Sequence, residues 1–318
     1  RLVAAMALLL IASMIVMLHY TRKAVKEEAI QKASQTLEGT IRNIDNILLS
    51  VEQSAGNMYF SMNLESDSRD KMFTSAHKMV ETNPYVAGCA IAFKENYYKD
   101  CRHFMAYVHR ADSAGMAYAD SEIVPDDMFA DAPYTEQTWF TAPMETGKAI
   151  WLNPLKGIKS DEAPIITFSL PLPGKDGKPI GVIGVDISLS MLSNIVSRAK
   201  PSKNSYCTLL DNDGTYIVHP FSNKLMNGTV LMVKEQSAKE AAQAMLSGQT
   251  GYRSFNMGGQ KLYVFYKPFK RSIVTGRMSD DLGWSAGIVY PEEDIFGEYN
   301  SLSLYIWGIA IVSLILSF

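Results

Sequence analysis

The sequence predicts an α+β protein, in which a long N-terminal helix precedes two tandem antiparallel-sheet domains and a transmembrane helix stands at each end. Three observations support this fold class. An uncharged apolar run lies at each end of the chain, one long helical pattern follows the first run, and strand-like segments joined by glycine-containing turns occur twice in the same order. At 318 residues the chain has room for two domains with substantial cores.

The two apolar runs predict membrane spans. Leu2–Leu18 contains no charged residue, and a full span needs about 20 residues, so we expect residues 1–20 to form a transmembrane helix. A signal peptide is the alternative, but no small-x-small cleavage site separates this run from the basic residues that begin at Arg22. Residues 301–318 are expected to begin a second span. Because both runs are cut off at the chain ends, we expect the chain to be part of a longer protein.

Two spans place residues 21–300 on one side of the membrane. The positive-inside rule says little here, since long loops cross the membrane largely regardless of charge. We expect an inner-membrane protein that crosses the membrane twice, with residues 21–300 in the periplasm. The 30 basic and 33 acidic residues give a net charge of -3, which excludes the strongly basic surface of a nucleic-acid-binding protein.

A long helix is predicted to follow the first run, over residues 21–62. Its apolar residues recur at alternating steps of four and three, the spacing of a heptad seam sustained for about three heptads. The seam comprises Leu37, Ile41, Ile44, Leu48, Val51, Ala55 and Met58. Two uses of the seam remain open. It packs on a second copy of the helix and gives a homodimer, it covers the core of its own domain, or it does both.

Residues 63–200 are expected to form the domain farther from the membrane. Apolar runs with strand character are separated by polar turns such as GKDG at 174–177, whose glycines suit a hairpin. The expected elements are a helix at Lys71–Thr82, strands at Tyr85–Phe93 and Arg102–Arg110, a loop at Asp112–Asp131, a helix at Pro133–Pro143, strands at Ala163–Leu170 and Ile180–Ile187, and a helix at Ser188–Lys200 with Ser188 as its N-cap.

Residues 201–300 are expected to form the domain nearer the membrane, and they repeat the same order of elements. These are strands at Tyr206–Leu210 and Thr215–His219, a helix at Glu235–Leu246, strands at Gly251–Asn256, Lys261–Pro268 and Leu282–Tyr290, and a helix that Pro291 opens. The DNDG motif at 211–214 predicts a hairpin turn rather than a calcium loop, because Ser222 stands where the last acidic ligand belongs.

Four motifs in the first domain carry a resemblance to a known family. They are the pair Trp139-Phe140, the GKAIW segment that ends at Trp151, the T-x-S-x-P run at 167–171, and GVIGVDI with Asp186. Together with the spans and the long helix, they resemble the double Cache (dCache, tandem PAS-like) sensor domains of bacterial transmembrane receptors, over nearly the whole chain. The resemblance implies that the membrane-distal domain binds a small molecule. It also implies that the second domain passes the change through the second span to a cytoplasmic output module outside this sequence.

The resemblance also indicates which residues would bind the ligand. The candidates are Tyr107, Tyr134, Gln137, Trp139, Phe140, Trp151, Thr167, Ser169 and Asp186. In the family, the acid at the position of Asp186 meets an ammonium group of the ligand. Amino-acid-binding members carry an arginine at the position of Gln137 and a tyrosine at the position of Ala132. Because glutamine cannot make a charge-assisted bidentate bond to a carboxylate, an amine or a neutral ligand is favoured over a standard amino acid.

Plainer readings of these residues remain open. Trp139 and Phe140 also suit an ordinary core, and Asp186 suits an N-cap of the following helix. Cys89 and Cys101 lie symmetrically about a turn, so they either form a cross-strand disulfide or stay free thiols.

Residue patterns that would indicate an enzyme are missing from the sequence. The histidines have no H-x-x-x-H or H-E-x-x-H spacing, and we find no P-loop or dinucleotide motif. We therefore expect no catalytic activity, metal or cofactor in this region. The competing functions are a membrane-tethered enzyme and a structural or partner-protein-binding ectodomain that takes no small molecule.

Overall fold

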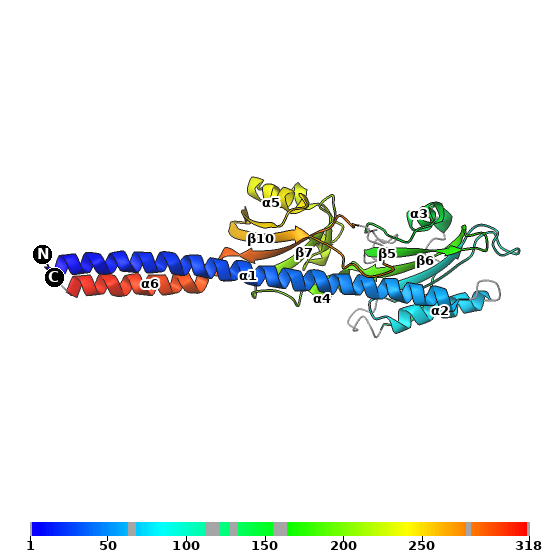
Figure 1. Cartoon of the computed structure of the whole chain (residues 1–318), viewed down its shortest axis with the longest axis horizontal. Helices are drawn as coiled ribbons and strands as arrows, with labels where there is room; N and C mark the ends of the chain where they lie inside the picture. Colours follow the sequence, from blue (N-terminus) through cyan, green and yellow to red (C-terminus); the bar gives the residue numbers. More distant parts are fainter. Residues whose placement is uncertain are drawn as a thin grey trace.

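A single helix, α1 (Leu2–Ser61), is the axis along which the rest of the chain is arranged (Figure 1). The computed structural model describes residues 2–62, 68–111, 121–126, 133–154, 164–277 and 281–316. With 60 residues at about 1.5 Å each, α1 is about 90 Å long. The expected span at 1–20 and the expected helix at 21–62 therefore form one uninterrupted element.

The first sheet lies at the end of α1 that is farther from the chain termini, and we call it the distal sheet. Its antiparallel strands run in the order β3-β2-β1-β6-β5-β4. They are β1 (Gly88–Phe93), β2 (Met105–Arg110), β3 (Ile123–Pro125), β4 (Ile150–Trp151), β5 (Ile165–Pro173) and β6 (Pro179–Ser188). Helices α1 and α2 (Arg69–Thr82) cover one face, and α3 (Thr138–Thr146) covers the other (Figure 1). A short 3-10 turn, η2 (Tyr134–Glu136), precedes α3.

The second sheet, which we call the proximal sheet, follows α4 (Leu189–Val196) and has the order β8-β7-β11-β10-β9. Its strands are β7 (Tyr206–Leu210), β8 (Tyr216–Val218), β9 (Gly251–Met257), β10 (Gln260–Pro268) and β11 (Ser285–Pro291). Helix α5 (Gln236–Leu246) covers one face and α1 lies along the other (Figure 1). Two 3-10 turns, η3 (Ser222–Lys224) and η4 (Val230–Met232), connect β8 to α5.

The pairing confirms the internal repeat. In each sheet the first strand pairs with the last: β1 pairs with β6, and β7 pairs with β11. In each sheet the last strand also pairs with the strand before it, and a short helix covers the outer face. A helix then begins directly after the last strand, α4 after β6 and α6 (Glu292–Leu316) after β11. Strand β3 has no counterpart in the proximal sheet.

Several boundaries differ from those expected from sequence. The expected helix at Pro133–Pro143 begins only at Thr138 and continues past Pro143 to Gly147, which has the left-handed φ of 65° that favours glycine. Strands β3 and β4 were not expected, because segments of three and two residues are too short to show an alternating pattern. The DNDG segment forms the expected hairpin turn, with the Asp211 N–H donating to Thr215 O at 2.9 Å.

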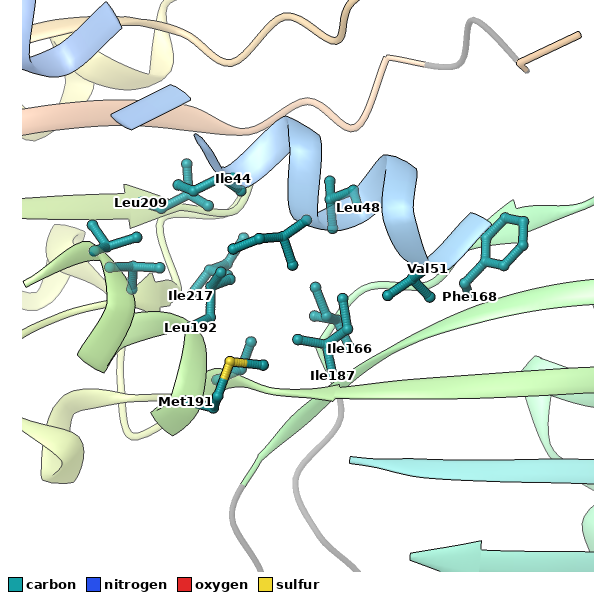
Figure 2. Packing of buried hydrophobic residues seen from close by; sticks show 14 of the residues in the cluster. Ile44, Leu48, Val51, Ile166, Phe168, Ile187, Met191, Leu192, Leu209 and Ile217 are labelled. Carbon is teal, nitrogen blue, oxygen red and sulfur yellow. The ribbon is translucent and has the colours of Figure 1, made fainter. Parts of the chain in front are cut away.

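The heptad seam of α1 faces the core of its own chain. Ile44, Leu48 and Val51 are fully buried. They pack among Ile166, Phe168 and Ile187 of the distal sheet, Met191 and Leu192 of α4, and Leu209 and Ile217 of the proximal sheet (Figure 2). One apolar core therefore runs through both domains beneath α1. A homodimer that uses another face of α1 stays a prediction.

The two ends of the chain lie side by side. Helix α6 runs back along the start of α1, so that both termini are at the same end of the molecule (Figure 1). The Tyr299 hydroxyl donates to Leu18 O at 3.0 Å. Both helices are long and apolar enough to cross a membrane, and in their most apolar windows only 6% and 0% of the residues are buried. Apolar side chains such as Leu9 and Ile309, 72% and 68% exposed, cover this surface, as expected for helices that lipid surrounds.

The remaining sequence expectations have plain outcomes. Cys89, Cys101 and Cys207 are free thiols, which decides between the two readings of Cys89 and Cys101. The Ser188 Oγ accepts from the Met191 N–H at 3.3 Å, so Ser188 is the N-cap of α4 as expected.

Replacing Leu48 with alanine should lower the free energy of unfolding by about 2–5 kcal/mol, because it leaves a cavity in the core that α1 shares with both sheets. Asn46→Ala is the matched control on the exposed face of the same helix and should change it by less than about 0.5 kcal/mol. Urea unfolding of the chain in detergent micelles, followed by circular dichroism, measures both values. Equal effects of the two substitutions would contradict a core centred on α1.

Candidate ligand-binding site

The two faces of the distal sheet differ in the size of their side chains. Strand alternation sends Ile91, Ile183 and Val185 toward α1, while Ala90 and Gly184 face α3. The Trp139 ring of α3 lies directly over Gly184, where an added Cβ would be 3.0 Å from a ring carbon. Small residues on the sheet therefore make the space that the aromatic side chains of α3 enter.

Asp186 lies on this α3 face, at the end of β6, and is 7% exposed. The Thr167 hydroxyl donates to Oδ1 at 2.6 Å, and the Tyr107 hydroxyl donates to Oδ2 at 3.3 Å. Burial raises the pKa of the Asp186 carboxyl to about 6, and these two hydrogen bonds oppose the rise. The alternative that Asp186 caps the following helix is wrong, because Ser188 occupies the N-cap position of α4.

Three aromatic rings cover the same face. Tyr134, Trp139 and Phe140 are each at most 5% exposed, and their ring centroids are 5.1–6.4 Å apart. The Tyr134 hydroxyl donates to Phe93 O at 2.7 Å and accepts from the Phe104 N–H at 3.0 Å. The hydroxyl of Tyr134 is therefore hydrogen-bonded to the backbone of Phe93 and Phe104, and its ring is the part that belongs to the aromatic cluster.

Ser169 and Gln137 are two further candidates, and Ser169 lies on the same face of β5 as Thr167. Ser169 is fully buried, pairs with Gly184 across the sheet, and its Oγ has no hydrogen-bond partner among the described residues. Buried hydroxyls normally have one, so this oxygen is suited to a ligand atom. Gln137 precedes α3, is partly exposed, and makes no capping bond with its side chain. Ala132 lies outside the described residues.

Trp151 does not belong to this group, which corrects the expectation from sequence. It pairs with Phe168 in the β4–β5 register, while Ile150 pairs with Ser169, so Trp151 shares the face of Phe168 rather than that of Ser169. Its indole lies 5.2 Å from the Phe168 ring, and its Nε1 donates to Glu52 Oε1 of α1 at 2.7 Å. Neighbouring residues of a strand point to opposite faces of the sheet, so Trp151 and Ile150 lie on different faces.

Two residues near the site were missed by sequence reasoning. The His109 ring stacks on Tyr107 with centroids 5.7 Å apart, and its Nε2 lies 3.6 Å from Asp126 Oδ2. Because Tyr107 and His109 are two apart on β2, the alternation of that strand was a signal that could have placed His109 on the α3 face. His109 also helps to hold down the pKa of Asp186.

The proximal domain provides an internal comparison, because the same face is built from different residues. Asp186 and Val289 are each three residues before the following helix, and Gly184 and Gly287 are each five before it. Across the sheet, Thr167 pairs with Asp186, whereas Val264 pairs with Val289. The polar pair of the distal sheet is therefore replaced by two valines.

In the proximal domain a methionine of α5 packs on the sheet where Trp139 packs in the distal domain. An added Cβ on Gly287 would lie 2.6 Å from the Met245 Cε of α5. Tyr206 and Tyr266 also face α5, and the remaining cavity measures about 40 Å³. Typical ligand pockets have about 300–1,000 Å³, so this face of the proximal sheet is a closed apolar core.

Comparisons with known proteins agree with the fold. The dCache_1 family model, described as a Cache domain, matches residues 21–299. The methyl-accepting chemotaxis protein PctB of Pseudomonas aeruginosa is 26% identical over 133 residues, which are 41% of this chain and 21% of that protein. The match thus spans about a fifth of the receptor.

Solved structures with the same fold cover most of the chain. The extracellular domain of the putative histidine kinase soHK1S-Z6 has a TM-score of 0.67 at 20% identity, covering 86% of this chain and 98% of that one. The ligand-binding domain of Pseudomonas aeruginosa PctB in complex with L-Arg has a TM-score of 0.59 at 17% identity, covering 89% and 97%. Since the family model matches most of its length, the chain belongs to the dCache_1 family of Cache sensor domains.

Proposed function

We propose that the chain is the periplasmic sensor region of a bacterial transmembrane receptor and that it binds a small molecule between α3 and the distal sheet. One observation carries the proposal. The α3 face holds a buried carboxylate and a buried hydroxyl under aromatic rings, whereas the matching face of the proximal sheet has valines at the positions of Asp186 and Thr167. A fold that repeats itself needs no buried carboxylate for its stability, so Asp186 is best explained by a ligand.

The chemistry of the face favours a ligand with an ammonium group. Asp186 would pair with that cation, and Trp139 and Phe140 would offer ring faces to it. The Ser169 hydroxyl would bind a second polar atom of the ligand. Gln137 stands where amino-acid-binding members of the family carry an arginine, which supports an amine over an amino acid.

Similar structures give a reason to test amino acids as well. One is described as the ligand-binding domain of Mlp24 with asparagine, and another as that of the Campylobacter jejuni chemoreceptor Tlp3 in complex with L-valine. These bind amino acids with the same fold, at 14% and 13% identity to this chain. Standard amino acids therefore form a separate arm of the screen below.

Signalling would follow from the direct connections between elements. A ligand shifts the equilibrium between two arrangements only by its different affinity for them. Strand β6, which carries Asp186, continues into α4, and β11 continues into α6 and the second candidate span. A change at the α3 face would thus reach the membrane through the proximal sheet or along α1.

A thermal-shift screen of the chain in detergent micelles should find stabilisation by small amines. Replacing Asp186 with asparagine keeps the shape of the side chain but removes its charge, so the amine should bind about 30-fold more weakly or worse. Trp139→Ala should weaken binding as well, because it removes the largest ring of the cluster. Calorimetric titration of the stabilising compound measures both losses.

The matched control for Asp186→Asn is Asp176→Asn. It makes the same charge change on the exposed turn between β5 and β6, and it should leave the affinity for the amine unchanged. Stabilisation only by standard amino acids would contradict the proposed ligand class but would be compatible with the proposed location of the site. A broad panel without any shift would contradict the sensor proposal and would favour an ectodomain that binds a partner protein.

The contribution of Asp186 to the stability of the unliganded chain should fall as the pH rises from about 4 to about 6. The folded pKa of Asp186 is about 6 and its ordinary value is 3.8, so between these values the folded chain binds more protons than the unfolded chain. The cost of ionising the buried carboxyl is on the order of 3 kcal/mol at neutral pH.

Asp186→Asn should remove that cost, so the variant should be more stable than the wild type at pH 7.5, and the difference should shrink at pH 4.5. Urea unfolding at both pH values measures it. A variant that is less stable than the wild type at both pH values would show that the carboxylate stabilises the unliganded fold.

A further inference from the structure

Four charged side chains form a buried cluster between α1 and the segment that leads from β10 to β11. Arg277 donates from Nε to Glu52 Oε2 at 2.8 Å and pairs through Nη1 with Asp45 Oδ1 at 2.7 Å. Arg271 pairs with Glu52 Oε1, and the Ser272 N–H donates to Asp45 Oδ2 at 2.7 Å. At most 10% of each charged side chain is exposed. The cluster fixes this segment of the proximal domain to the C-terminal third of α1.

The distal sheet reaches the same cluster through Trp151. Its Nε1–H donates at 2.7 Å to Glu52 Oε1, the oxygen that also accepts from Arg271. One carboxylate oxygen of α1 thus receives hydrogen bonds from both domains. Trp151 is the aromatic residue that the ligand site does not use.

A short route connects Trp151 to Asp186. The N–H of Leu152, the residue after Trp151, donates to Thr167 O at 3.0 Å. The Thr167 hydroxyl in turn donates to Asp186 Oδ1 at 2.6 Å. Asp186 and Glu52 therefore lie on opposite faces of the same strands, joined by β4 and β5. Any displacement of β5 caused at Asp186 would act on the hydrogen bond at Glu52.

The cluster lines a cleft of about 590 Å³ between the two domains. Its walls are α1, the edge of the distal sheet near Phe168, and the Arg271–Arg277 segment. The domains are also joined by α4, whose Met191 and Leu192 pack in the shared apolar core (Figure 2). Motion of one domain relative to the other about α4 would widen or narrow the cleft, and the cluster at Glu52 would oppose it.

A buried charge cluster is better suited to coupling the motions of two domains than to raising the stability of the fold. Burying ion pairs costs desolvation energy that their attraction roughly repays, so they contribute little net stability. They are sensitive to geometry, because a buried charge that loses a partner is left uncompensated. A small displacement of the Trp151 indole would therefore change how strongly Glu52 holds the two arginines.

We propose that Glu52 acts as a latch, by which we mean a side chain whose hydrogen bonds hold the two domains together. Trp151 is the positioning residue through which the distal domain sets the mobility of the Arg271–Arg277 segment. The latch joins the strands that carry the ligand site to the domain that leads into α6. Its use in signalling rests on the function proposed above, whereas the coupling itself exists without a ligand.

Hydrogen exchange of the full chain in nanodiscs, read by mass spectrometry without any ligand, tests the coupling. Trp151→Phe keeps the ring on Phe168 but removes the N–H donor. Exchange in the Arg271–Arg277 segment should rise about tenfold, as expected for the loss of one hydrogen bond to a charged acceptor. The amides of β10 and β11 should stay protected, since global stability is unchanged.

Coupling between two sites is reciprocal, so the converse variant provides the second readout. Arg271→Gln should raise exchange in β4 and at Leu152, across the cleft from the substitution. Tyr59→Phe is the matched control, because it removes one hydroxyl from an aromatic residue in the wall of the same cleft. It should leave both segments unchanged.

Two results would overturn the latch. One is that hydrogen exchange rises only in the domain that carries the substitution. Trp151 would then have a local structural role only. The other is an equal effect of Tyr59→Phe. Because no ligand is used, a negative ligand screen leaves this result intact, and the two proposals fail separately.

Discussion

The burial of the α1 seam is the constraint on which the rest of the structure depends. Both sheets place one apolar face on the same stripe of the same helix, and Ile44, Leu48 and Val51 have no exposed surface left. A continuous helix cannot bend sharply without losing backbone hydrogen bonds, so the two domains are held in line along α1. Their outer faces, under α3 and α5, remain free to differ.

Those outer faces differ in the residues that the proposed ligand site would use. The α5 face is closed by Met245, tyrosines and valines, as a small domain core requires. The α3 face instead keeps a buried carboxylate at some cost to stability. The distal domain has the chemistry of a binding site, and the proximal domain has that of a rigid connection to α6. The cluster around Glu52 is a polar contact between them.

Local signals in the sequence predicted most of the fold. The heptad spacing, the glycine turns and the apolar runs were enough for the long helix, the hairpins, the Ser188 cap and the repeat. Contacts between residues far apart in the sequence could not be predicted from these local patterns. The family resemblance groups Trp151 with Trp139, but the face on which Trp151 lies depends on a pairing register that only the folded sheet fixes. The pairing of Asp45 and Glu52 with arginines more than 200 residues later leaves no local pattern at all.

The central claim is that a ligand binds between α3 and the distal sheet, and a crystal structure of the chain with a stabilising compound tests it most directly. The account predicts electron density for the compound beside Asp186 and under the Trp139 ring, with a polar atom near Ser169. Density beneath α5, or in the cleft beside Glu52, would contradict it.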